Sequence, residues 1–230
     1  MENLQNSMYR YERKFFISGL SRSEIESIIH IHPNVFNEIY YERRVNNIYF
    51  DTLRFNNFQD NVIGNTDRIK FRIRWYGKIF STINNPVLEL KIKRGLVGTK
   101  KSFVLQSFKL DRGFNNSVPS KFIQDSDIDG KVKFNLQDQL PVMLNSYKRK
   151  YFQSSDKKFR LTLDSSQSFY RLNTLNNLLI DKYEDYDNFI IELKYEEKYD
   201  KEAPSITNRF PFRLTKSSKY ARGIELLYSS

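Results

Sequence analysis

The sequence has no cysteine among its 230 residues, which excludes disulfide bonds and thiolate-bound metal ions. It has no run of about 18 apolar residues, so no segment reads as a membrane-spanning helix. Residues 1–6 lack the apolar core of a signal peptide. The only two histidines, His30 and His32, have no third histidine beside them, and we do not assign them to a metal site. We expect a cytoplasmic protein that has no membrane segment of its own.

Aromatic residues are plentiful, with 19 Phe and 15 Tyr, and the apolar fraction of 39% is too high for a disordered chain. Aromatic side chains favour strands over helices, and the chain is long enough to bury one sizeable core. We therefore predict a single domain over residues 1–230 that is built mainly of strands.

Basic residues outnumber acidic ones by 38 to 27, which gives a formal net charge of +11. This balance is compatible with a basic surface, with nonspecific nucleic-acid binding or with a small polyanionic substrate. Net charge does not choose among these partners, so the placement of the charges has to decide.

Residues 69–77, Ile-Lys-Phe-Arg-Ile-Arg-Trp-Tyr-Gly, alternate between apolar and cationic side chains. In an extended strand this alternation places Arg72 and Arg74 on one face and Ile73 and Trp75 on the other. Comparable patterns predict further strands over residues 9–18, 45–50, 87–93, 99–104, 146–153, 159–163 and 188–195.

Helical signals lie between and after these strands. Ser21 and Glu24 have the spacing of a capping box, which predicts a helix that ends near His32. A last helix is expected before residue 227, and residues 111–145 read as a helical insertion. Most connections are too short for parallel crossovers, so the pattern favours an α+β fold with an antiparallel sheet that curls or closes.

Cationic residues recur on the strand faces that lie opposite the apolar ones. The set comprises Lys14, Arg72, Arg74, Lys91, Lys101, Arg149, Arg160 and Lys194. Two unit charges roughly 8 Å apart repel by about 2 kcal/mol at an effective dielectric constant near 20, so cations gathered in one interior need an anion to neutralise them. Arginine forks match phosphate oxygens. If the sheet is open instead, these residues face water as on any half-buried strand.

Two carboxylates interrupt the cationic strands. Glu89 precedes Lys91 by two residues and Glu192 precedes Lys194 by two, so each carboxylate shares a strand face with an ammonium group. Each is either part of a surface ion pair or, beside phosphates, a ligand for a hard divalent ion such as Mg²⁺ or Mn²⁺.

The ordered set of motifs resembles the triphosphate tunnel metalloenzyme superfamily, and within it the polyphosphate polymerase branch, which is the catalytic domain of the vacuolar transporter chaperone complex and its bacterial relatives. The motifs are Tyr11-Glu12-Arg13-Lys14, Ile48-Tyr49-Phe50-Asp51-Thr52, Arg72-Ile73-Arg74-Trp75-Tyr76-Gly77, Glu89-Leu90-Lys91, Lys101-Ser102, Tyr147-Lys148-Arg149-Lys150-Tyr151-Phe152, Arg160-Leu161-Thr162-Leu163-Asp164, Ile191-Glu192-Leu193-Lys194 and Ser218-Lys219-Tyr220. The resemblance implies an antiparallel eight-stranded closed β-barrel with flanking helices, whose tunnel binds a nucleoside triphosphate such as ATP or a polyphosphate chain.

The resemblance also implies roles for individual residues. The catalytic residues that grip the reacting phosphates would be Arg72, Arg74, Lys91, Arg149 and Arg160. Further phosphate contacts would come from Lys14, Lys101, Tyr147, Lys194, Ser218 and Lys219. Glu192 would hold the divalent metal, Mn or Mg. The implied reaction adds the terminal phosphoryl group of the nucleotide to a growing polyphosphate chain, and no nucleic-acid partner is expected.

The chain departs from the hydrolytic members of the superfamily at its first motif. Those enzymes begin with Glu-x-Glu-x-Lys, where this chain has Arg10, Glu12 and Lys14, and the missing carboxylate favours the polymerase branch. Hydrolysis of tripolyphosphate or of a triphosphate end remains an alternative, as does a non-catalytic module that binds polyphosphate or nucleic acid. We also expect that this chain alone does not couple synthesis to export into an organelle.

Overall fold

The computed structural model describes residues 10–94, 97–111, 114–115, 123–172 and 181–228. These residues form two compact units. The first unit takes in residues 10–43, 147–167 and 185–217, and the second takes in residues 44–146, 168–184 and 218–228. Three long strands supply residues to both units, namely β2 (Asn37–Asp51), β8 (Leu140–Gln153) and β9 (Phe159–Arg171).

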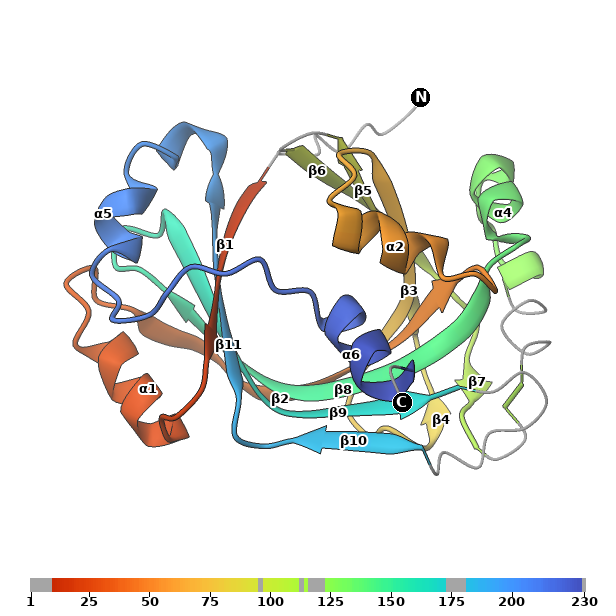
Figure 1. Cartoon of the computed structure of the whole chain (residues 1–230), viewed down its shortest axis with the longest axis horizontal. Helices are drawn as coiled ribbons and strands as arrows, with labels where there is room; N and C mark the ends of the chain where they lie inside the picture. Colours follow the sequence, from red (N-terminus) through yellow and green to blue (C-terminus); the bar gives the residue numbers. More distant parts are fainter. Residues whose placement is uncertain (1–9, 95–96, 112–113, 116–122, 173–180, 229–230) are drawn as a thin grey trace. The chain divides into compact units, whose positions relative to one another are not determined.

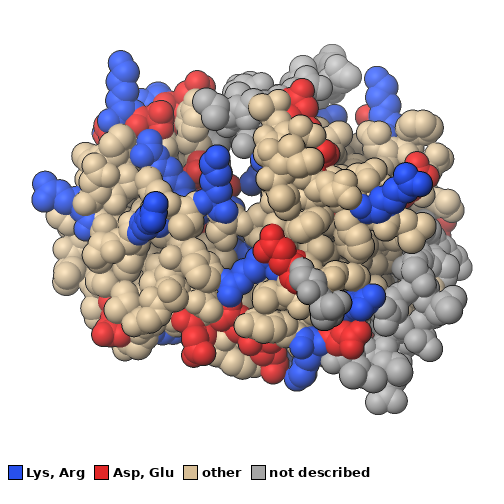
Figure 2. Space-filling model, in the orientation of Figure 1, with Lys and Arg blue, Asp and Glu red and all other residues tan. Residues whose placement is uncertain are grey.

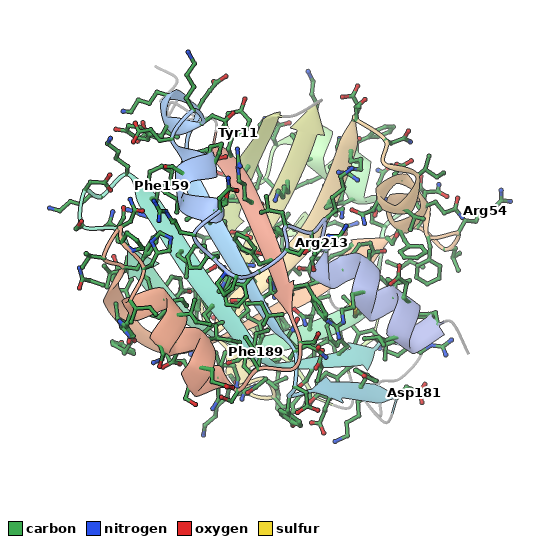
Figure 3. The ribbon with its side chains drawn as sticks, turned by 60° about the vertical axis from the view of Figure 1, so that its left-hand side comes forward. Tyr11, Arg54, Phe159, Asp181, Phe189 and Arg213 are labelled. Carbon is green, nitrogen blue, oxygen red and sulfur yellow. The ribbon has the colours of Figure 1, made fainter. Side chains whose placement is uncertain are left out.

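The first unit contains β1 (Arg10–Ile17) and β11 (Phe189–Glu196), which pair with each other, and β11 also pairs with β9. Both pairings are antiparallel, and Figure 3 accordingly shows Phe159 and Phe189, the first residues of β9 and β11, at opposite ends of neighbouring ribbons. One face of these strands is apolar and is covered by α1 (Arg22–His30) and α5 (Ala203–Thr207), which lie on the same side of β1 and β11 in Figure 1. A short 3₁₀ helix, η1 (Glu197–Tyr199), follows β11.

The capping box predicted for α1 is confirmed. The hydroxyl of Ser21 accepts a hydrogen bond from the backbone N–H of Glu24 at 3.3 Å, and the Glu24 carboxylate accepts one from the N–H of Ser21 at 2.7 Å. Ile25 and Ile29 then lie one turn apart and are fully buried against the strands. The sequence therefore predicts both the start of this helix and the side that it buries.

The second unit contains β3 (Arg68–Tyr76), β5 (Val87–Arg94) and β6 (Val97–Val104), which continue the sheet from β2 through antiparallel pairs. In β3, Ile73 and Trp75 are buried in the core of the unit, whereas Arg72 and Arg74 are partly exposed, so the predicted alternation of this strand is confirmed. The shorter strands are β4 (Thr82–Ile83), which pairs with β7 (Phe108–Lys109), and β10 (Lys182–Asp185), which pairs with β9.

Among the described residues of the second unit are the helices α2 (Asn56–Ile63), α4 (Gly130–Leu136) and α6 (Lys219–Tyr228). Asp51, at the end of β2, accepts hydrogen bonds from the backbone N–H groups of Asn57 and Phe58 at 2.9 and 3.0 Å, and from the hydroxyl of Tyr220 in α6. One buried carboxylate thus joins a strand to two helices. Among the described helices, none has the length and apolar character needed to cross a membrane.

The antiparallel α+β class is confirmed, but the prediction of a closed eight-stranded barrel was wrong. The hydrogen-bonded order is β1-β11-β9-β8-β2-β3-β5-β6, and within the described residues its two end strands do not pair with each other. The sheet is therefore open. In β6, Lys100 and Lys101 are exposed and Val104 is 70% exposed. Lysines on an edge strand oppose further strand pairing, which is consistent with an end at β6.

Two strands begin earlier than predicted. β2 starts at Asn37 instead of residue 45. None of residues 37–44 is buried, so they carry no apolar alternation that a pattern could detect. β8 starts at Leu140, within the segment predicted as an insertion. Residues 95–96 of the predicted turn and residues 112–113 and 116–122 of the predicted insertion lie outside the described residues. The organisation of residues 1–230 as one domain with an insertion stays a prediction.

Gly223 in α6 allows a close approach between this helix and the sheet. A Cβ atom at this position would overlap Met143 Sδ and would lie 2.6 Å from Phe169 Cδ1, and both neighbours are fully buried. We predict that Gly223→Ala lowers the free energy of unfolding by about 1–3 kcal/mol, because the buried side chains must shift. Urea unfolding checks this. Gly130→Ala in α4, where nothing lies within 4 Å, should cause no loss, and equal stability of the two variants would contradict the packing described.

Candidate functional site

The first unit has a polar face on the side of the strands opposite α1 and α5. The register pairs Lys14 with Glu192 between β1 and β11, and pairs Glu192 with Thr162 between β11 and β9. Residues two positions away on each strand share this side because side chains alternate. We call this set the β11 face, and it consists of Glu12, Lys14, Arg149, Arg160, Thr162, Asp164, Glu192 and Lys194.

Arg149 of β8 is the most deeply held cation of the β11 face, with 6% of its surface exposed. Its Nε and Nη2 atoms donate to the two oxygens of Asp164 at 2.5 and 2.6 Å, and Nη2 also donates to Glu192 Oε2 at 3.3 Å. Burial alone would lower the pKa of Arg149, but Asp164, Tyr147 and Glu192 outweigh it and raise the pKa well above its ordinary value. Arg149 is therefore a permanent charge in a fixed orientation.

Glu192 lies between several cations. Its Oε1 atom is 3.4 Å from the Lys14 ammonium, and its Oε2 atom is 3.1 Å from that of Lys194. The carboxylate of Glu12 lies 3.5 and 3.7 Å from the same two ammonium groups. Lys14 also donates to the carbonyl of Ser217 at 3.1 Å. Two carboxylates and two ammonium groups thus alternate in one compact square.

The second unit has a comparable cluster around Glu89 of β5, which is 5% exposed. Arg72 Nη2 lies 2.6 Å and Arg74 Nη1 lies 3.7 Å from Glu89 Oε2, while the Lys100 ammonium lies 2.7 Å from Oε1. Arg74 Nε also donates to Asn47 Oδ1 at 2.8 Å. The two arginines chosen from the sequence are thus held side by side by one buried carboxylate.

Three lysines stand opposite one another next to this cluster. The register pairs Lys70 of β3 with Lys91 of β5, and Lys91 with Lys100 of β6. Like charges at opposite positions of neighbouring strands are destabilising. We call the set of Lys70, Arg72, Arg74, Glu89, Lys91 and Lys100 the β3 face.

The remaining predicted phosphate contacts fall at different places. Lys101 stands opposite Leu90 and is exposed, so the register puts it on the side of the apolar residues and not on the β3 face. Ser218 directly precedes α6, and its hydroxyl accepts hydrogen bonds from the N–H of Ala221 and from the Lys70 ammonium, both at 3.4 Å. Lys219 is buried at the start of α6, with 8% of its surface exposed.

Tyr147 is also buried, and its ring centroid lies 5.1 Å from the guanidinium carbon of Arg149. The first unit therefore brings together Lys14, Tyr147, Arg149, Glu192 and Lys194, and the register adds Arg160 opposite Lys194.

Sequence reasoning assigned no role to five residues of the two faces, namely Glu12, Lys70, Lys100, Thr162 and Asp164. Lys70 lies two residues before Arg72 and therefore shares its strand face, so the alternation of side chains could have identified it. Lys100 and Lys101 are consecutive, and only the strand register shows which of the two shares a side with Glu89.

The formal charge of +11 is not gathered into one broad basic patch on the face that Figure 2 shows, where acidic and basic side chains are interspersed. The β11 and β3 faces instead hold guanidinium and ammonium groups in fixed positions around buried carboxylates. Groups oriented in advance bind oxyanions at a low cost in side-chain entropy. This arrangement suits an oxyanion ligand.

The ion pairs of Glu89 predict a specific dependence of stability on pH. Burial would raise the pKa of the Glu89 carboxyl, but Arg72, Arg74 and Lys100 together hold the pKa well below its ordinary value. The unfolded-state pKa is about 4.3, so the stabilisation is present above this pH and is lost as the pH falls toward the lower folded-state value. Glu89→Gln should therefore lose about 1 kcal/mol less stability than the wild type between pH 6 and pH 3.5 in urea unfolding.

Glu225→Gln is the matched control for that measurement, because Glu225 is an exposed carboxylate on α6. It should follow the pH dependence of the wild type. If Glu89→Gln also follows it, the carboxylate does not hold the cations as described.

Among solved structures, the chain is similar to a protein of Vibrio parahaemolyticus that is described as a proposed adenylate cyclase. The TM-score is 0.52 at 10% identity, and the alignment covers 94% of this chain and 97% of that one. A proposed adenylyl cyclase of Hippeastrum, described with a dominant triphosphatase activity, gives a TM-score of 0.49 at 15% identity over 93% of each chain. Protein PH1819 of Pyrococcus horikoshii OT3 gives 0.49 at 13% identity over 94% of this chain and 99% of that one. The first of these likenesses supports the fold alone.

No curated protein matches the chain. The family model of the VTC domain, in contrast, matches residues 9–228, which is nearly the whole sequence. This match confirms the resemblance that the ordered motifs indicated, from the Tyr-Glu-Arg-Lys motif in β1 to the Ser-Lys-Tyr motif at the start of α6. The chain therefore belongs to the VTC domain family.

Proposed function

We propose that this protein is a metal-dependent polyphosphate polymerase, which transfers the terminal phosphoryl group of a nucleoside triphosphate such as ATP to a polyphosphate chain. The observation that carries the proposal is the row of Lys70, Lys91 and Lys100 on three neighbouring strands. Like charges at directly opposite positions of neighbouring strands are destabilising. A ligand with one negative charge after another relieves this repulsion, and a phosphate chain is such a ligand.

The arginines have the geometry that phosphate recognition needs. Arg72 and Arg149 each place two nitrogen atoms on one carboxylate, which has nearly the same fork of oxygens as a phosphate group. We assign the reacting phosphates to Arg72, Arg74, Lys91, Arg149 and Arg160. We assign further phosphate contacts to Lys14, Lys70, Lys100, Tyr147, Lys194, Ser218 and Lys219.

The reaction needs no protein nucleophile. A terminal oxygen of the polyphosphate chain attacks the γ-phosphorus of the nucleotide, a new P–O bond forms, and the bond from that phosphorus to its bridging oxygen breaks. The nucleoside diphosphate leaves with the electron pair. Positioning and charge neutralisation are the main contributions to such a transfer, and fixed guanidinium and ammonium groups supply both.

The carboxylates fit a divalent metal ion only together with phosphate oxygens. Within the described residues no group of three or more His, Asp or Glu side chains is placed to hold a metal ion. Glu192 and Glu12, however, share the same two ammonium neighbours, and hard divalent ions such as Mg²⁺ or Mn²⁺ bind one or two carboxylates plus phosphate oxygens. Glu192, with Glu12 beside it, would hold this ion, which neutralises charge on the transferred phosphate when bound.

The first test is the product formed from ATP. We expect purified protein with ATP and Mn²⁺ or Mg²⁺ to form polyphosphate, resolved together with ADP and orthophosphate by electrophoresis. Glu192→Gln should reduce the rate by at least about 100-fold, because it removes the metal-binding charge. Glu225→Gln, an exposed carboxylate outside both faces, should keep the wild-type rate.

Other products would identify the alternatives. Orthophosphate release from tripolyphosphate without polymer would show a hydrolase, in which water takes the place of the chain oxygen. Tight binding of polyphosphate with no turnover under any metal ion would show a binding module. Either result would overturn the polymerase proposal. The cytoplasmic location and the lack of a nucleic-acid partner stay separate predictions, which the product assay does not test.

Lys100 and Lys101 give a matched pair that tests the β3 face. Both are exposed lysines on β6, but only Lys100 contacts Glu89 and stands opposite Lys91. We predict that Lys100→Met weakens tripolyphosphate binding about 5- to 20-fold in calorimetric titration at low salt, because it removes one charge from the row. Lys101→Met should change the Kd by less than about twofold. The reverse order would show that the register argument places the wrong lysine on the ligand.

A further inference from the structure

Thr162 lies in the centre of the β11 face and takes no part in the ion pairs that surround it. It stands opposite Glu192 in the register of β9 and β11, and Arg160 and Asp164 are two residues before and after it on its own strand. The residue is 7% exposed. Its Oγ1 atom is buried and, among the described residues, has no hydrogen-bond partner. Burying a hydroxyl without a partner is destabilising, so this hydroxyl calls for an explanation.

Packing does not require a hydroxyl at this position. Thr and Val have nearly the same branched shape and both favour strands, so Val would fill the same space without a buried polar atom. The apolar core of the unit is on the other side of β9, where Leu161 and Leu163 are fully buried. Thr162 instead points to the side of the charged groups, where a hydroxyl can donate to an oxygen atom.

The nearest carboxylates already interact with cations. Both oxygens of Asp164 accept from Arg149, and both oxygens of Glu192 lie within 3.4 Å of Lys14, Lys194 or Arg149. A neutral hydroxyl is a weaker donor to a carboxylate than these charged groups. A phosphate group bound on this face would bring additional acceptor oxygens, and the hydroxyl would bind them without adding to the repulsion among the cations.

We propose that Thr162 is a further substrate-binding residue, whose hydroxyl donates a hydrogen bond to an oxygen of the phosphate chain held by Arg149 and Arg160. This inference rests on the proposed function, since it assigns a new contact within the same phosphate-binding face. The unpaired hydroxyl destabilises the ligand-free protein, and it increases the affinity for the anion by donating a hydrogen bond to it. A threonine with a purely structural role would stabilise the ligand-free protein through its hydroxyl and would not affect the affinity.

The test is Thr162→Val in the full chain, with thermal unfolding of the ligand-free protein and calorimetric titration with tripolyphosphate. We expect a Tm equal to or higher than that of the wild type, because an unpaired buried hydroxyl is removed. We expect the Kd for tripolyphosphate to rise about tenfold, the effect of one hydrogen bond to a charged acceptor. Thr162→Ser, which keeps the hydroxyl, should stay within about threefold of the wild-type Kd.

Thr207 provides the matched control, because it is equally buried but has partners. Its hydroxyl donates to the carbonyl of Ala203 at 3.1 Å and accepts from Arg13 at 3.5 Å. Thr207→Val should lower the Tm and leave the Kd unchanged. For Thr162→Val, a wild-type Kd or a lowered Tm without ligand would overturn this inference alone. A wild-type protein that does not bind tripolyphosphate would overturn it together with the proposed function.

Discussion

Ion pairs between buried carboxylates and arginines hold the cationic side chains of both units in place. In the first unit Asp164, which is fully buried, binds Arg149 through two hydrogen bonds, and Glu192 adds a third. In the second unit Glu89 has the same relation to Arg72 and Arg74. Without Asp164 and Glu192, the guanidinium group of Arg149 would be a buried charge without its ion pairs, which is strongly unfavourable. Without Glu89, Arg72 and Arg74 would lose the carboxylate that holds them side by side. The orientation of the arginines, and hence any recognition of phosphate by them, depends on these contacts.

Such clusters are a poor means of gaining stability. Taking an ion pair out of water costs about as much as the attraction returns, and apolar residues of similar volume often stabilise a fold better. The aligned lysines of the β3 face add further repulsion. A protein that keeps these features sacrifices stability for oriented charge, which is useful where an anion must be bound and its charge neutralised during a reaction. Membership of the VTC domain family is consistent with this interpretation.

Local patterns predict the elements and their faces well, and they predict contacts between elements poorly. The alternation in β3 predicts that Arg72 and Arg74 lie on the polar side of the strand, and the capping box predicts where α1 begins. The partners of Glu192, in contrast, come from β1 and β8, and strand pairing alone brings them together. The same holds for the choice of Lys100 over Lys101, which depends on register. The prediction of a closed barrel was wrong because closure requires the end strands β1 and β6 to pair, and no local sequence pattern encodes the pairing of these two strands.

The central claim is that the carboxylate-held arginines bind the phosphates, and ¹⁵N NMR of the arginine Nε–H groups tests it most directly. The Nε atoms of Arg72 and Arg149 donate to Glu89 and Asp164, so their resonances should be observable, and substitution by Lys assigns them. On titration with tripolyphosphate we predict large, saturable shifts of both resonances. Arg22, whose Nε atom donates to Glu26 on α1, should show no such shift. Shifts of equal size at all arginines, or at Arg22 alone, would contradict the account.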